Sequence, residues 1–166
     1  LRMRRLALVG FGRIALKHLE VFRALDCDFV AACNRSEEGR RKAEKEGGIP
    51  KTYRHPIEML EKEQPDDVIC CPSFDNVYDV ASKLIPYGVP LLLEKPPGVS
   101  VKEARGLAQL AETSGTPVMV GMNRRHYSVI DKALAELGGL RAVTAVFVEW
   151  SEDPAHLLGN RKMSSE

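Results

Sequence analysis

No apolar run in the 166-residue sequence is long enough to cross a bilayer, because the longest, residues 89–93 and 117–120, have only the length of strands. The sequence also lacks a surplus of either charge: 24 Lys and Arg face 23 Asp and Glu, for a formal charge of +1. Proteins that bind nucleic acid or anionic membranes typically carry a basic stripe. The apolar stretch 6–9 runs into glycine without the small-residue cleavage site of a signal peptide. These absences predict a cytoplasmic protein that binds neither nucleic acid nor membrane.

Cysteine is scarce as well, with four residues and no C-x-x-C pair. Cys70 and Cys71 are neighbours, so their side chains would point to opposite faces of a strand. Together with Cys27 and Cys33 they are expected to be reduced, buried thiols rather than members of a disulfide or zinc site. No metal site is predicted.

Short apolar runs rich in β-branched residues alternate with longer segments of helical period, which is typical of βαβ units around a parallel sheet. Strands are predicted at residues 5–9, 29–33, 68–71, 91–94 and 118–120. Helices are predicted at residues 13–25, 37–46, 56–63, 76–87 and 101–114. Ser36 can cap the second helix, and Ser100 forms a capping box with Glu103. The pattern predicts an α/β fold with a doubly wound parallel sheet.

The alternation of strand and helix patterns ends at Gly121. A polar cluster follows, and then a short helix is predicted at 130–137 and a new strand at 142–150. This strand falls beyond the expected close of the doubly wound unit, so it is expected to begin a second domain of the α+β type. The residues after it contain too few apolar side chains to complete such a domain. The predicted domains are therefore 1–122 and 123–166, the second consisting of a linker helix and the first strand of an incomplete domain.

The first predicted strand runs into a glycine-rich turn that opens a helix, with the sequence Gly10-Phe11-Gly12-Arg13-Ile14-Ala15. This G-x-G-x-x-A pattern between a strand and a helix is the fingerprint of a dinucleotide site, although a purely structural turn is the alternative. Gly10 would permit the tight turn and Gly12 would let the backbone approach a diphosphate. The anion would lie on the unpaired N–H groups at the helix N-terminus. We predict cofactor contacts from Gly10 through Ile14, with Ala15 allowing the helix to pack closely.

The residue that ends the second strand decides which dinucleotide is favoured. A carboxylate there would bond both ribose hydroxyls of NAD, but the sequence has Asn34, which does not repel a 2′-phosphate. Arg35 and Ser36 follow with a guanidinium and a hydroxyl suited to that phosphate. The sequence therefore favours NADP over NAD, the alternative being that Arg35 stacks on adenine and Asn34 tolerates NAD. Arg40 and Arg41 are expected on the solvated face of the following helix.

The segment 91–98, LLLEKPPG, places Glu94, Lys95 and Pro96 at the end of a predicted strand, on the sheet edge where open α/β folds bind ligands. Two further stretches accompany it, Cys71-Pro72-Ser73 and Gly121-Met122-Asn123-Arg124-Arg125. With the glycine turn, these motifs resemble the E-K-P, T-P-N and G-x-N-x-R segments of the Gfo/Idh/MocA family, the glucose–fructose oxidoreductase and inositol dehydrogenase group. The resemblance is to the N-terminal half of that family and extends to Trp150.

The resemblance implies an NAD(P)-dependent oxidoreductase that moves a hydride between nicotinamide and a secondary alcohol of a sugar, polyol or related hydroxylated compound. Lys95 would be the catalytic residue, handling the proton of the substrate hydroxyl, and Glu94 would fix the Lys95 loop and the cofactor. The resemblance also implies an unusual peptide geometry at Pro96, where a cis bond costs only about 0.5–1 kcal/mol. Further cofactor contacts are implied for the matching positions Cys71, Pro72, Ser73, Asn76, Asn123 and Arg125.

Departures from the family pattern occur at Ser73, where the family has Asn, and at Asn76, where it often has His. The family takes an Asp and a catalytic His from its second domain, and Asp153 and His156 do not fit that helix because Pro154 lies between them. The fragment alone is therefore expected to be inactive, and substrate binding and homo-oligomer contacts are expected in the remainder of the second domain.

A non-catalytic dinucleotide-binding sensor of the same superfamily is the alternative function. Lys95 favours the enzyme, because a sensor has no need of a proton relay. No catalytic role is predicted for the remaining histidines. His18 and His55 are assigned to surface or capping positions, and His126 to packing or pocket lining.

Overall fold

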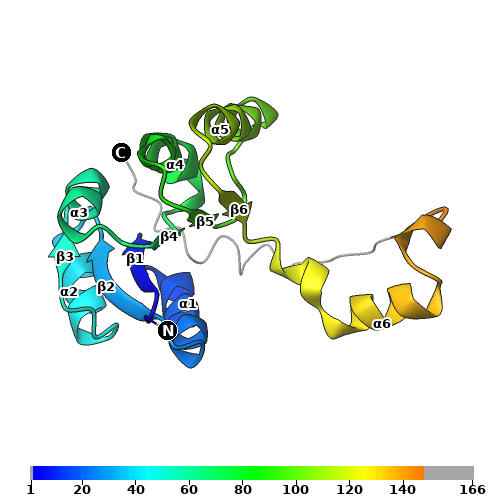
Figure 1. Cartoon of the computed structure of the whole chain (residues 1–166), viewed down its shortest axis with the longest axis horizontal. Helices are drawn as coiled ribbons and strands as arrows, with labels where there is room; N and C mark the ends of the chain where they lie inside the picture. The colour runs from blue at the N-terminus through cyan, green and yellow to red at the C-terminus, as the bar shows by residue number, and fades with distance from the viewer. Residues whose placement is uncertain (1, 148–166) are drawn as a thin grey trace, which may run out of the picture. The chain divides into compact units, whose positions relative to one another are not determined.

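The computed structural model describes residues 2–147, and the chain divides between Met122 and Asn123 into two units (Figure 1). The first unit is built on a six-stranded sheet. Its strands are β1 (Arg5–Val9), β2 (Asp28–Cys33), β3 (Thr52–Tyr53), β4 (Asp67–Cys70), β5 (Leu91–Leu93) and β6 (Val118–Val120). The order across the sheet is β3-β2-β1-β4-β5-β6 and every neighbouring pair is parallel, which confirms the predicted doubly wound Rossmann sheet.

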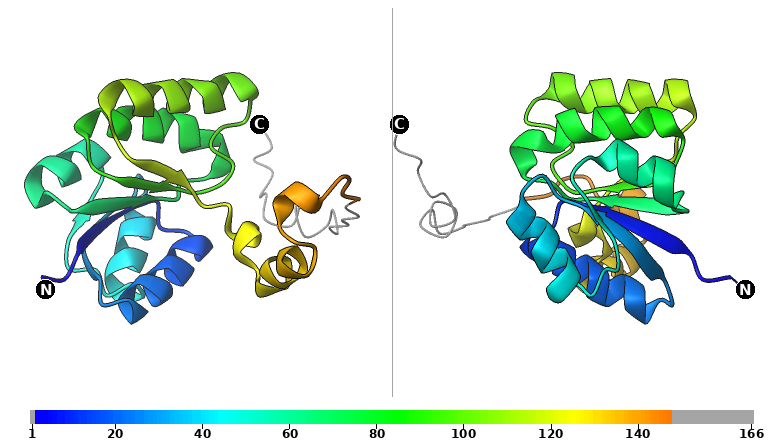
Figure 2. Two further views of the ribbon diagram at one scale, coloured as in Figure 1. Left: turned by 45° about the vertical axis from the view of Figure 1, so that its right-hand side comes forward. Right: turned by 90° about the vertical axis from the view of Figure 1, so that its left-hand side faces the viewer.

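Helices connect the strands and cover both faces of the sheet (Figure 2). They are α1 (Arg13–Ala24), α2 (Glu37–Lys45), α3 (Pro56–Glu63), α4 (Val77–Leu84) and α5 (Val101–Ser114). The strand order reverses between β1 and β4, and crevices that bind ligands form at such a reversal, outside the carboxyl ends of the strands. None of the helices within residues 2–147 combines the length and apolar character that a membrane span requires.

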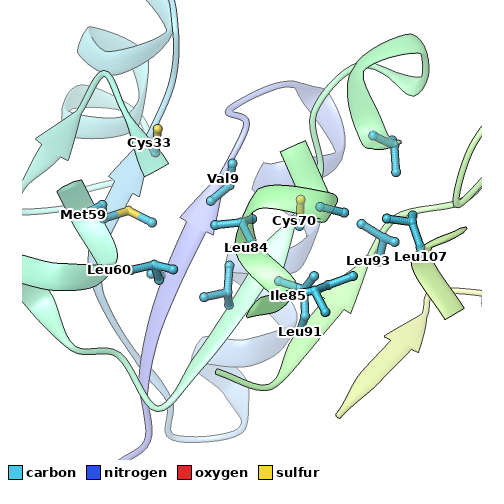
Figure 3. Packing of buried hydrophobic residues seen from close by; sticks show 14 of the residues in the cluster. Val9, Cys33, Met59, Leu60, Cys70, Leu84, Ile85, Leu91, Leu93 and Leu107 are labelled. Atoms are coloured by element: carbon cyan, nitrogen blue, oxygen red, sulfur yellow. The ribbon is translucent and has the colours of Figure 1, made fainter. Parts of the chain in front are cut away.

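The core consists of two apolar clusters, one on each face of the sheet. Figure 3 shows the larger cluster, in which Met59 and Leu60 of α3, Leu84 of α4 and Leu107 of α5 pack against the strands. The other cluster lies under α1 and α2 and includes the buried residues Ala15, Leu19 and Ala43. Successive strand residues enter opposite clusters, as Leu91, Leu92 and Leu93 do, because strand side chains alternate between faces. Burial on both faces explains why the strands are continuously apolar.

The predicted elements lie within about two residues of the observed ones, with two exceptions in the first unit. Strand β3 was not predicted, because a two-residue strand has no periodic pattern; it is held by the Ala32 and Asn34 amides, which donate to the carbonyls of Lys51 and Tyr53. The helix predicted at 76–87 is shorter than expected and is flanked by 3-10 turns, η1 (Phe74–Asn76) and η2 (Ile85–Tyr87). Pro86 has no N–H to continue an α-helix, so the last turn tightens.

Both predicted N-caps are present. The Ser36 hydroxyl accepts the Gly39 amide at 3.1 Å, and the Ser100 hydroxyl accepts the Glu103 amide at 3.2 Å. The Glu103 carboxylate returns to the amide of Val99, at 2.8 Å, rather than to that of Ser100 as in a standard capping box.

The second unit begins with the 3-10 helix η3 (Asn123–His126), followed by α6 (Ser128–Glu136) and the 3-10 turn η4 (Leu140–Ala142). The short helix after the polar cluster was predicted. The strand predicted at 142–150 is wrong for residues 142–147, which form the end of η4 and an irregular segment. A strand is held by hydrogen bonds to a neighbour, and the apolar residues of this segment alternate only imperfectly. Residues 148–150, Asp153 and His156 lie outside the described residues.

A buried carboxylate ties α3 to the β3 edge of the sheet. Glu63 is 6% exposed, and its carboxylate accepts Lys51 Nζ at 2.8 and 3.0 Å as well as the Tyr53 hydroxyl. The Arg5 guanidinium donates to the Glu63 carbonyl at 2.6 Å. The hydrogen bonds from Lys51 and Tyr53 lower the pKa of Glu63, and the bond to Glu63 raises the pKa of Tyr53 to about 12. The carboxylate is therefore ionised in the folded protein at neutral pH.

We predict that Glu63→Gln lowers the free energy of unfolding at pH 7 by about 1–3 kcal/mol, the cost of leaving buried hydrogen-bonding groups poorly paired. The pKa of Glu63 is lowered in the folded state, so its stabilisation is complete above the ordinary value of 4.5 and is lost as pH falls through the folded pKa. Urea unfolding should show the difference between the two proteins shrinking in acid. Glu58→Gln, which breaks an exposed pair with Lys62 on the same helix, should cost much less, and an equal cost would contradict the prediction.

Candidate functional site

A cavity of about 980 Å³ lies at the carboxyl ends of the strands in the first unit. Most of the predicted cofactor residues line it: Gly10, Phe11, Gly12, Ile14, Asn34, Arg35, Ser36, Cys71, Pro72, Ser73 and Asn76. Arg13, Glu94 and Lys95 are not among its lining residues. The structure thus brings together the ends of β1, β2 and β4, which are neighbours in the sheet but far apart in the sequence.

Gly10 occupies a position that no other residue can take. Its φ is +87°, in the left-handed region, and a Cβ there would lie 2.5 Å from the carbonyl oxygen of Cys71. Gly12 differs, because its backbone is extended and no atom of the described part of the chain lies within 4 Å of where its Cβ would be. Gly10 therefore makes the turn possible, whereas Gly12 leaves open space beside the start of α1.

The turn carries amide donors that have no acceptor among residues 2–147. The amides of Gly10, Phe11 and Ala15 donate to the Cys33 carbonyl, the Asn34 side chain and the Gly12 carbonyl. Among the described residues, none accepts the amides of Gly12, Arg13 and Ile14, and no side chain caps the helix. Free N–H groups at a helix N-terminus form an anion-binding site, since the helix dipole adds to their partial charge. The geometry suits a diphosphate.

The Asn34 side chain connects this turn to the next one. Its Oδ1 accepts the Phe11 amide at 3.1 Å, and its Nδ2 donates to Ser36 Oγ at 2.9 Å. A Cβ on Gly39 would lie 1.7 Å from that nitrogen, so glycine in the first turn of α2 makes room for the amide. The sequence analysis missed Gly39, although a glycine inside a helix costs about 1 kcal/mol relative to alanine and signals close packing.

Arg40 corrects the sequence prediction, because it is not simply on a solvated face. It is half-buried, and its Nη1 donates to the carbonyls of Asn34 and Arg35 at 3.0 Å each, bracing the loop between β2 and α2. These carbonyls lie in the loop after the last residue of β2, outside the strand ladder, so the guanidinium on α2 can satisfy them. Arg41 is exposed and pairs with Glu37 at 2.5 Å, as expected for helix surface.

The cysteines are free; Cys33, Cys70 and Cys71 are buried as predicted, whereas Cys27 is only half-buried. Cys71 Sγ donates to the Gly10 carbonyl at 3.1 Å, which fastens the end of β4 to the glycine turn. Burial raises the pKa values of Cys71 and Cys33 to about 12, and that of Cys70 well above its ordinary value. These thiols are therefore neutral at physiological pH and are not nucleophiles. The loop that follows is held by Asn76, whose Nδ2 donates to Ser73 Oγ at 2.9 Å.

The E-K-P turn follows β5, and its Lys95–Pro96 bond is cis, as the resemblance implied. The Glu94 Oε2 atom accepts the Lys95 amide at 3.2 Å, and the Lys95 side chain is exposed. The other carboxylate oxygen lies 2.8 Å from Nε2 of His18 on α1. The assignment of His18 to surface or capping was wrong, because its side chain is only 18% exposed and pairs with Glu94. Its position between Ala15 and Phe22 on one face of α1 was the available signal.

The cavity extends to residues that the sequence analysis did not assign to the site. They are Arg54, His55, Pro56 and Ile57 at the start of α3, and Asp79, Val80 and Lys83 on α4. His55 stands at the N-cap position of α3, but its side chain makes no cap hydrogen bond. Arg54 was missed because β3, which precedes it, was not predicted, and the α4 residues were missed because a helical pattern does not show which side chains face a cavity.

The remaining predicted residues, Asn123 and Arg125, belong to the second unit. Both are exposed on η3, as is His126. Their assigned roles stay predictions. Within residues 2–147, no group of three or more His, Cys, Asp or Glu side chains is arranged to hold a metal ion.

Comparison with protein families matches residues 4–122 to the model described as "Oxidoreductase family, NAD-binding Rossmann fold". The chain is 32% identical over 123 residues to D-apiose dehydrogenase of Paraburkholderia graminis, which covers 72% of this chain and 32% of that protein. It is 25% identical over 122 residues to myo-inositol 2-dehydrogenase of Thermotoga maritima, covering 73% of this chain and 36% of that protein. The chain thus spans about a third of the length of these relatives.

Among solved structures, the chain resembles an oxidoreductase from Agrobacterium radiobacter in complex with NAD+, L-tartaric acid and magnesium. The TM-score is 0.76 at 20% identity, and the match covers 82% of this chain and 40% of the other. At this identity the similarity shows the fold alone.

We predict that the two glycines of the turn respond differently to alanine. Gly10→Ala should lower the free energy of unfolding by about 1–3 kcal/mol or more, because the Cβ meets the Cys71 backbone and φ is positive. Gly12→Ala should change it by less than about 0.5 kcal/mol, since its Cβ enters open space. Denaturant unfolding measures both, and equal losses would show that the turn is not packed as described.

Proposed function

The chain belongs to the oxidoreductase family with an NAD-binding Rossmann fold, and from this premise we propose that it is the cofactor-binding part of an NAD(P)-dependent dehydrogenase. The proposed reaction moves a hydride between the nicotinamide ring and a secondary alcohol of a sugar, polyol or related compound. The names of two relatives, D-apiose dehydrogenase and myo-inositol 2-dehydrogenase, support this substrate class. Substrate contacts and self-association through the second unit belong to the same proposal.

The free amides of Gly12, Arg13 and Ile14 are the observation that carries the proposal. Three N–H groups at the N-terminus of α1 would bind the diphosphate of the dinucleotide, and Gly12 leaves room for it to approach the backbone. The adjoining cavity is lined by the ends of β1, β2 and β4, so the residues present fit the group. When bound, the nicotinamide ring supplies the hydride acceptor or donor.

The adenosine end favours NADP in this proposal. Asn34 provides no negative charge at the end of β2. Its side-chain amide is already hydrogen-bonded to the glycine turn and to Ser36. The Ser36 oxygen accepts Asn34 Nδ2 and the Gly39 amide, which leaves its own O–H to donate. Arg35 is exposed at the cavity, and Arg54 lines the same cavity. A hydroxyl and two guanidinium groups are suited to a 2′-phosphate.

Lys95 is the proposed catalytic residue. Its neutral amine would accept the proton of the substrate hydroxyl as hydride leaves the same carbon, and in the reverse direction its ammonium would return a proton to the carbonyl oxygen. The side chain is exposed at the carboxyl end of β5, and the Glu94 carboxylate holds the backbone amide of the same residue. Lys95 is thus held at its backbone while its side chain remains available to a substrate.

We expect Arg35→Ala to raise the Kd of NADPH about tenfold or more and that of NADH less than about twofold, because only NADPH carries the phosphate that the guanidinium would bind. Titration of nicotinamide fluorescence measures both constants. Arg41→Ala is the matched control, since Arg41 is exposed on α2 and outside this cavity. Tighter binding of NADH than of NADPH by the unsubstituted protein would refute the preference for NADP.

We expect Lys95→Met to lower hydride transfer by about 10²–10⁴-fold, the usual contribution of a positioned acid or base. The assay follows the 340 nm absorbance of NADPH while the natural protein reacts with each of a panel of sugars and polyols. Lys102→Met, an exposed change on α5, should leave the rate unaltered. Tight NADPH binding without turnover of any substrate would favour the non-catalytic sensor, and full activity of Lys95→Met would exclude the proposed role.

A further inference from the structure

His18 is a polar residue on the buried stripe of α1. The buried residues Ala15 and Leu19 and the half-buried Phe22 lie on the same face of the helix, and all three pack into the cluster beneath α1 and α2. The His18 and Phe22 rings are 6.3 Å apart. An imidazole on such a stripe requires a hydrogen-bond partner, because burying an unpaired polar group is costly. Its partner is the Glu94 carboxylate.

Strand alternation brings Glu94 to α1. Leu92 packs into the cluster on the α1 side of the sheet while Leu93 packs into the opposite cluster, so Glu94 follows Leu92 onto the α1 side. The two side chains are only 18% and 15% exposed, and Nε2 of His18 lies 2.8 Å from Oε1 of Glu94. That separation is the length of a strong hydrogen bond between groups of opposite charge or polarity.

The Glu94 carboxylate has a partner on each oxygen. Oε1 contacts His18, and Oε2 accepts the backbone amide of Lys95 at 3.2 Å. The carboxylate also lies against the end of β6, where a Cβ on Gly121 would be 3.6 Å from Oε1, an ordinary contact. The side chain therefore links α1 to the turn that begins with Lys95.

Helix α1 consequently contributes to two parts of the proposed cofactor site, through the amides at its N-terminus and through the His18–Glu94 pair. The free amides lie at the N-terminus of α1, and His18 lies about 7.5 Å along the axis from Arg13 at about 1.5 Å per residue. We propose that His18 is a positioning residue that, through Glu94, fixes the Lys95 turn relative to the diphosphate-binding end of α1. This inference rests on the proposed function, because it concerns how the nicotinamide end of the dinucleotide is held beside Lys95.

The proposal predicts a selective effect on ligand binding. The adenosine and diphosphate contacts lie at the glycine turn and the end of β2, whereas the His18–Glu94 pair braces only the Lys95 turn. Loss of the pair should therefore weaken binding of an intact dinucleotide and spare a ligand that ends at the diphosphate and its ribose. A residue with a merely structural role would affect both ligands alike.

The test compares NADPH with 2′-phospho-ADP-ribose, which lacks the nicotinamide ring. His18→Leu keeps an apolar side chain on the stripe and removes the donor; it should raise the Kd of NADPH about tenfold, equivalent to about 1.4 kcal/mol, and that of 2′-phospho-ADP-ribose less than twofold. His18→Gln, whose amide can donate to Glu94, should restore most of the affinity. Lys17→Leu, which adds leucine at the neighbouring exposed position, is the control.

Equal weakening of both ligands by His18→Leu would overturn the inference, and so would unchanged NADPH binding. Failure of the unsubstituted protein to bind either ligand would refute the proposed function itself, and the inference with it. If circular dichroism shows that His18→Leu does not fold, Glu94→Gln takes its place. That variant keeps the size of the side chain, removes its charge, and must show the same difference between the two ligands.

Discussion

Gly10 and Cys71 approach so closely that no side chain fits between them, and the arrangement of the site depends on this contact. The backbone after β1 turns with a positive φ, its carbonyl accepts the Cys71 thiol, and its amide donates to the Cys33 carbonyl. The end of β1 is thereby held between the ends of β2 and β4. Because the strand order reverses at β1 and β4, α1 and α4 leave on opposite faces and a cavity opens between their connections.

Some polar groups around this cavity hold the protein's own loops, and others remain exposed. Asn34 and Arg40 are occupied in holding loops, since their side chains bond backbone groups at the glycine turn and at the end of β2. The buried thiols are neutral and add only packing and a weak donor. Arg35 and Lys95 remain exposed at the carboxyl ends of their strands. A rigid frame of satisfied groups thus presents a few available ones, which is the requirement for a preorganised binding site.

Much of the fold could be predicted because its pattern is local. Buried parallel strands are continuously apolar, helices show their own period, and glycine or serine marks many of their ends. Prediction failed where local pattern is weak or depends on a partner. The two-residue β3 exists through its pairing with β2, and residues 143–147 are irregular although their composition suggested a strand. The early end of α4 could have been predicted, because Pro86 cannot donate the backbone hydrogen bond of an α-helix. The helical period of the apolar residues continues past Pro86, and the prediction followed that period.

The sequence by itself determined the alternation of strands and helices, the glycine turn that opens α1, and the charged turn after β5. Each of these is visible in contiguous residues, as a periodic pattern or as a short motif. Tertiary structure alone decided that His18 meets Glu94, that Gly39 makes room for Asn34, and that Arg54 reaches the cavity. Such contacts join residues brought together by sheet order and helix packing, and a linear pattern carries no record of which faces will meet.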